Sequence, residues 1–192
     1  MLARLYQRTI SLARSPYAPW VLGAVSFSES SVFPIPPDLL LIPMVIAAPN
    51  RAFLYAGICT IASVAGGAAG YMIGALMFEH IGQPILILYG LLDQFSAFSE
   101  KFNAHGSLAV LIAGLTPFPY KVITIASGVT GLDVTQFLLW SAIARGLRFF
   151  IVAGLLWKFG DPIRNFIERR LGLFLSVFAL LLVAGFILAA WI

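Results

Sequence analysis

Charged residues are scarce in this sequence, and their scarcity decides the class of protein. Lys, Arg, Asp and Glu make up 10% of the 192 residues, whereas 60% are hydrophobic and the mean hydropathy is +0.96. A soluble globular domain carries about 25% charged residues. The composition excludes such a domain and predicts one integral membrane domain over residues 1–192, with an all-α fold.

Cysteine and histidine are also nearly missing. The single Cys59 cannot form an internal disulfide, and His80 and His105 stand alone, without the spacing of a zinc site. We therefore expect no metal and no cofactor. We also expect no enzyme, because no histidine or cysteine lies near the charged residues that could carry chemistry. The net charge of +4 fits basic helix ends beside anionic lipid better than it fits nucleic acid.

Long apolar runs predict the membrane-spanning helices. Three runs are long enough to span with some tilt: residues 52–78, 134–157 and 171–192. Residues 1–14 mix leucines with arginines, which predicts an interfacial amphipathic helix and no cleaved signal peptide. Residues 80–106 are less apolar and predict further interfacial helices. Their negative charge, against the basic N-terminal end, predicts that this loop lies outside and that the N-terminus is cytoplasmic.

Two Pro-x-Pro-x-charge motifs interrupt the remaining apolar segments. The motif residues are Pro34, Pro36 and Asp38 within residues 20–48, and Pro117, Pro119 and Lys121 within residues 107–131. A straight helix does not absorb prolines so closely spaced. Each segment therefore predicts a re-entrant hairpin of two half-helices with the prolines at its tip, buried in protein or facing water. The alternative is that both motifs are loops outside the membrane.

The order of these segments predicts an inverted repeat. Each half contains an interfacial segment, a re-entrant hairpin and a spanning helix, and the halves enter from opposite faces; a last helix is appended. Broken helices at corresponding positions of two such halves are typical of a transporter's binding site. Within residues 52–78, Gly66, Gly70 and Gly74 share one helix face, which predicts close helix packing rather than ligand binding.

Five ionisable residues fall at predicted membrane depth: Glu29, Asp38, Lys121, Arg145 and Arg148. Charges there need partners or a watery cavity. The surplus positive charge would be balanced by one bound anion. Two guanidinium groups on one helix face suit a phosphate, so the arginines and Lys121 are the predicted phosphate-binding residues. Glu29 and Asp38 are predicted to balance these cations and to take up protons. The alternative is that the charges only pair to fix helix packing.

These residues also resemble a known family. The chain is similar to the DedA family, the VTT-domain or SNARE-associated superfamily, through residues 25–150. The resemblance rests on Glu29, the first proline motif, the glycine-rich helix, the second motif with Gly128, and the two arginines. It implies paired opposing re-entrant hairpins and movement of phospholipids or undecaprenyl phosphate, sometimes linked to proton motive force.

The second hairpin departs from the common family form, which carries arginines there. Gly114-Leu115-Thr116-Pro117 lacks that arginine, and Lys121 stands where a second is expected. The chain looks like a shorter, YqaA-like branch. The resulting hypothesis is a flippase in the bacterial inner membrane for a lipid with an anionic phosphate headgroup. A scaffold protein and a small-ion transporter are the alternatives, and a homo-oligomer stays open.

Overall fold

Helices account for nearly all of the chain that the structure, a computed structural model, describes. These residues are 15–32, 36–116 and 119–160, and no strand occurs among them. The all-α prediction is therefore confirmed for these ranges. The predictions for residues 1–14 and 171–192, and for Pro34 and Pro117, lie outside them.

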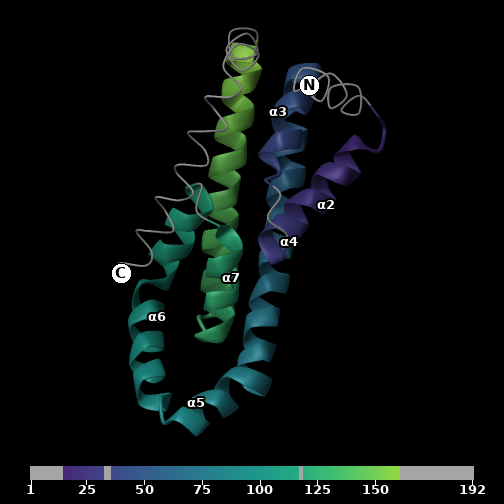
Figure 1. Ribbon diagram of the computed structural model, residues 1–192. Coiled ribbons are helices and arrows are strands. Elements are labelled where there is room, and N and C mark those ends of the chain that lie inside the picture. The colour runs from purple at the N-terminus through teal and green to yellow at the C-terminus, as the bar shows by residue number, and fades with distance from the viewer. Residues whose placement is uncertain (1–14, 33–35, 117–118, 161–192) are drawn as a thin grey trace, which may run out of the picture.

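The helices follow one another with short connections. Their bounds are α2 (Ala18–Ser31), α3 (Asp38–Ala47), the 3₁₀ turn η1 (Pro49–Arg51), α4 (Ala52–Met77), the π-helical turn η2 (Phe78–Gly82), α5 (Gln83–Tyr89), α6 (Leu92–Leu115), α7 (Tyr120–Val129) and a final helix, Val134–Gly160. Two helical stretches, Pro49–Tyr89 and Val134–Gly160, are long and apolar enough to cross a membrane. In Figure 1 the long rods are α4 and the final helix, and α5 turns the chain from α4 into α6 at the lower end.

Proline residues mark both helix breaks that the sequence singles out. Helix α2 ends at Ser31 and α3 begins at Asp38, with Pro37 as its N-cap. Helix α7 begins after Pro119. Proline is tolerated at a helix start because the backbone N–H that it lacks would be unpaired there in any case. Each break therefore ends one helix and starts the next.

The helix boundary predicted between residues 106 and 107, where the interfacial segment is expected to end and the second hairpin to begin, is not seen. Helix α6 runs without interruption from Leu92 to Leu115 and so joins the predicted interfacial segment to the first arm of the second hairpin. One glycine costs a helix only about 1 kcal/mol. Gly106 also packs directly on the Leu132 side chain, so its lack of a Cβ serves a contact rather than a helix end.

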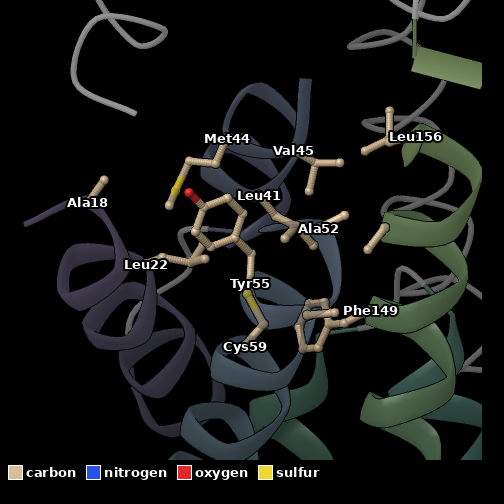
Figure 2. Close-up of a cluster of buried hydrophobic side chains, with 12 residues drawn as sticks. Ala18, Leu22, Leu41, Met44, Val45, Ala52, Tyr55, Cys59, Phe149 and Leu156 are labelled. Atoms are coloured by element: carbon tan, nitrogen blue, oxygen red, sulfur yellow. The ribbon is translucent and has the colours of Figure 1, made fainter. Parts of the chain in front are cut away.

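One core cluster fixes the first helical pair at the start of α4. Ala18 and Leu22 of α2 meet Met44 and Val45 of α3 over Tyr55, as Figure 2 shows. Phe149 and Leu156 close the cluster from the final helix. Helix α3 thus returns the chain to the cluster at which α2 began, so α2 and α3 form a hairpin whose open end lies beside Ala52.

Helix α7 returns the chain toward the start of α6. The Asn103 side-chain amide donates a hydrogen bond to the Thr130 carbonyl oxygen over 2.8 Å. The Tyr71 hydroxyl on α4 donates to the Leu132 carbonyl oxygen over 2.6 Å. The open end of the α6–α7 hairpin therefore lies beside the second half of α4, away from the open end of the α2–α3 hairpin.

The glycine face of α4 lets α2 and α7 pack against it by backbone contact. Gly66 lies against Phe27 of α2, and Gly74 lies against Ile125 of α7. Side-chain-free positions of this kind allow two helix backbones to approach closely. The predicted packing role of this face is therefore seen in the structure. Helix α2 contacts α4 from its start as far as Gly70, and α7 contacts it from Gly67 to Gly74, so the two lie end to end along one helix.

Candidate functional site

The site begins where the end of α2 meets the start of α7. The Lys121 ammonium donates to the carbonyl oxygen of Val32, the C-cap of α2, over 3.3 Å. The Thr124 hydroxyl lies 3.2 Å from the Ser30 carbonyl oxygen. Helix C-termini carry unpaired carbonyl groups, so donors at this point satisfy them. Two helices from different hairpins are thereby joined at their ends.

This meeting point lies near the middle of the long helices. At about 1.5 Å per residue, the 26 residues of α4 span about 39 Å. Ser63, which faces the end of α2, lies about 17 Å from Ala52 and about 21 Å from Met77 along the helix axis. Arg145 bonds to Ser63 and lies near the middle of the helix Val134–Gly160.

Arg145 is buried and paired with Glu29. Its Nη2 atom donates to Glu29 Oε2 over 2.8 Å, and its Nε atom donates to Ser63 Oγ over 2.6 Å. The guanidinium carbon lies 4.9 Å from the centre of the Tyr120 ring and 4.7 Å from that of Phe149. Aromatic faces attract a cation and exclude water from it. Only 1% of Arg145 is exposed to solvent.

Arg148 lies one turn further and takes the other acid. Its Nη2 atom donates to Asp38 Oδ2 over 2.5 Å, and its Nη1 atom donates to the Thr116 carbonyl oxygen over 2.8 Å. Thr116 is the C-cap of α6, whereas Asp38 lies in the first turn of α3. The helix dipole favours a negative charge at the start of a helix and a positive charge at its end, so both positions are stabilising. One arginine therefore links both hairpins.

The structure thus brings together all five ionisable residues that the sequence selects. Two arginines neutralise two acids, and Lys121 forms no ion pair within the described ranges. The two arginines do not act on one partner: each binds a different carboxylate. Among the described tips, Pro36 and Pro37 precede Asp38, and Pro119 precedes α7. The described residues contain no group of three or more His, Cys, Asp or Glu that could hold a metal ion.

Sequence reasoning missed the neutral partners of these charges. Ser30 and Ser63 hydrogen-bond to each other and to the Glu29–Arg145 pair, and the Tyr120 ring lies against the Arg145 guanidinium group. The Tyr120 hydroxyl also donates to Ser141 Oγ over 2.5 Å. A lone serine in an apolar helix carries no sequence signal, since it commonly bonds to its own helix backbone. Only the three-dimensional contact identifies its partner.

Replacing Tyr120 with phenylalanine should lower stability modestly. The change removes the hydrogen bond to Ser141 but keeps the ring over Arg145, so we expect a loss of about 1 kcal/mol. Thermal unfolding of the purified variant in detergent measures it. The double variant with Ser141→Ala should lose no more than the larger single loss, because both changes remove one bond. Additive losses would contradict the contact.

Comparison with known proteins places the chain in a family. The model of the VTT domain matches residues 35–158, a range that contains Asp38, Lys121, Arg145 and Arg148. An uncharacterized protein of Haemophilus influenzae is 36% identical over 188 residues, covering 96% of each chain. An uncharacterized protein of Histophilus somni is 38% identical over 168 residues, covering 85% of this chain and 87% of its own. No solved structure matches the chain. The protein therefore belongs to the VTT-domain family, the domain of the DedA proteins.

Proposed function

We propose that this protein is a flippase for a lipid with an anionic phosphate headgroup, a phospholipid or undecaprenyl phosphate. Family membership suggests a membrane transporter-like role. The substrate class is inferred from the charges. Three cations and two acids gather where two helix breaks meet, which leaves one positive charge to be balanced by an anion. That observation carries the proposal.

The proposal includes an inverted pair of re-entrant hairpins, α2–α3 and α6–α7. Their open ends lie beside opposite halves of α4, and their tips meet near its middle. Each of α2, α3 and α7 has 10 to 14 residues and so reaches only about 15–21 Å, less than the ~30 Å hydrocarbon core. Helix α6 is longer, about 36 Å, so it is the meeting of the two tips beside α4, together with the short α2, α3 and α7, that favours the hairpin interpretation over loops outside the membrane. The N-terminus would be cytoplasmic, in the bacterial inner membrane.

Arg148 and Lys121 are the proposed first contacts of the phosphate. The Arg148 side chain is 17% exposed and its partner Asp38 is 18% exposed, against 2% for Arg145. A phosphate has the oxygen geometry to replace a carboxylate on a guanidinium fork. Arg145, one helical turn away, adds its positive charge to the site without leaving Glu29. Lys121 would leave the carbonyl oxygen of Val32, a neutral acceptor, for an anionic one.

Asp38 is the proposed proton acceptor when the phosphate arrives. Its Oδ1 atom is buried and has no hydrogen-bond partner in the described part of the chain. A buried polar atom without a partner is costly unless something binds it. Once Arg148 turns to the phosphate, a proton on Asp38 would remove the charge left behind. Glu29 keeps its ion pair with Arg145.

Transport by reconstituted protein tests the proposal. Vesicles containing a short-chain lipid phosphate should expose its headgroup on the far leaflet, and Arg148→Ala should slow this about tenfold or more, the worth of one charge-assisted hydrogen bond. Asp38→Asn should also slow it. Arg51→Ala, an exposed arginine of η1, is the matched control and should translocate normally.

Two rival functions predict different results. The pairing of both acids with arginines supports a scaffold whose charges only fix helix packing. Vesicles containing such a scaffold would translocate the lipid no faster than vesicles without protein. A small-ion transporter would release entrapped inorganic phosphate without moving the lipid. Normal translocation by both Arg148→Ala and Asp38→Asn would refute the proposed site.

A further inference from the structure

A closed ring of hydrogen bonds surrounds the inner ion pair. Arg145 Nε donates to Ser63 Oγ over 2.6 Å, and Ser63 Oγ lies 2.7 Å from Ser30 Oγ. Ser30 Oγ lies 3.2 Å from Glu29 Oε2, which also accepts from Arg145 Nη2 over 2.8 Å. Ser30 and Ser63 are fully buried. Four side chains from α2, α4 and the final helix thus form one circuit.

The direction of every bond in this ring is determined. A guanidinium only donates and a carboxylate only accepts. Ser30 gives its single proton to Glu29, so the bond between the serines must carry the Ser63 proton. Ser63 therefore accepts from Arg145 and donates to Ser30. A hydroxyl performs both tasks with one oxygen, which alanine cannot do at all.

The second ion pair, Arg148 with Asp38, forms no such ring among residues 15–32, 36–116 and 119–160. Arg148 holds Asp38 through one carboxylate oxygen and bonds otherwise to a backbone carbonyl oxygen. The second oxygen of Asp38 has no partner in the described ranges. Arg145, in contrast, has bonds along one edge and the rings of Tyr120 and Phe149 over its faces. Releasing Arg145 would break several contacts at once, whereas releasing Arg148 from its acid breaks one.

We propose that Ser63 is a positioning residue that, with Ser30, locks Arg145 onto Glu29, so that Arg148 alone exchanges its carboxylate for the anion. The lock is a statement about the fold of this chain. Only the exchange at Arg148 rests on the proposed function. Arg145 thereby holds α2, α4 and the final helix together, whereas Arg148 binds the anion.

Arginine modification separates the two side chains directly. Phenylglyoxal reacts with accessible guanidinium groups, and mass spectrometry of the full-length protein in detergent gives the rate at each residue. In the unaltered protein, Arg145 should react at least about tenfold more slowly than Arg148, since each hydrogen bond to a charged group changes an opening equilibrium by about that factor. Inorganic phosphate should slow the reaction of Arg148 and leave that of Arg145 unchanged.

Matched variants test the part played by Ser63. Ser63→Ala should raise the rate at Arg145 about tenfold, and Ser30→Ala should raise it as well. Thr60→Ala is the control for the first, since its hydroxyl bonds to the Ala56 carbonyl oxygen of the same helix. Ser26→Ala is the control for the second, because Ser26 is equally buried but bonds to the Cys59 carbonyl oxygen. Neither control should change the rate.

The outcomes separate the lock from the proposed function. Equal rates at the two arginines in the unaltered protein would overturn the lock without any variant. Unchanged Arg145 rates in both serine variants would overturn the part played by the serines. If phosphate protects neither arginine while the serine variants behave as expected, the exchange at Arg148 and the anion site are refuted and the lock stands. Protection of Arg145 by phosphate would overturn the division of tasks.

Discussion

Replacing Gly66 with alanine should prevent α2 from packing on α4. A Cβ atom at this position would lie 2.1 Å from the Phe27 carbonyl oxygen and 2.9 Å from the Phe27 Cα atom. These are backbone atoms, so no rotation of a side chain relieves the contact and α2 must move as a whole. Overpacking a core costs about 1–3 kcal/mol where side chains can adjust. We expect a loss above that range here, seen as little folded protein in detergent extracts.

The same helix supplies the control. A Cβ atom added at Gly57 would have no neighbour within 4 Å outside its own helix backbone, so Gly57→Ala should change stability by no more than about 1 kcal/mol and in the stabilising direction. Gly128→Ala should resemble Gly66→Ala, because its Cβ atom would lie 2.0 Å from the Tyr71 carbonyl oxygen. Size-exclusion profiles and thermal unfolding compare the three. Equal stability of the Gly57 and Gly66 variants would contradict the close approach of α2 and α4.

The spacing of these glycines predicted close packing but not its partner. A four-residue repeat of small residues marks one face of a helix, and this follows from helix geometry alone. That α2 covers Gly66 while α7 covers Gly74 depends on where two separate hairpins come to rest. Such contacts join residues far apart in the chain, and one sequence contains no record of them.

The charged residues show the same division between composition and contact. The cost of burying charge in an apolar chain selected the five residues and required partners for them. It did not decide which acid each arginine takes, because Arg145 and Glu29 are 116 residues apart. Ser63 and Ser30 were missed because their role exists only once α2, α4 and the final helix meet. The assignment to the YqaA-like branch stays a prediction.

Removing Arg145 alone should have the largest effect of any change to a charged residue. Arg145→Met would keep much of the apolar volume between Tyr120 and Phe149 but leave Glu29 without its cation. Breaking a buried ion pair at one partner costs about 3–5 kcal/mol, whereas replacing both partners is often close to neutral. We therefore expect Arg145→Met to unfold far below the unaltered protein and the double variant with Glu29→Gln to recover most of the loss. Thermal unfolding in detergent measures both.

The double variant also separates fold from function. If the charges serve only to fix helix packing, a chain that folds with Glu29→Gln and Arg145→Met keeps its cellular role. If they surround a phosphate, the same chain folds with Arg148, Lys121 and Asp38 unchanged and still moves the headgroup, and adding Arg148→Ala in this background should lower translocation about tenfold or more, the effect of one lost charge-assisted hydrogen bond. Equal instability of the single and double variants would show that Arg145 stabilises the protein through its aromatic contacts rather than through Glu29. The hydrogen-bond ring through Ser63 would then not be holding an ion pair that stabilises the fold.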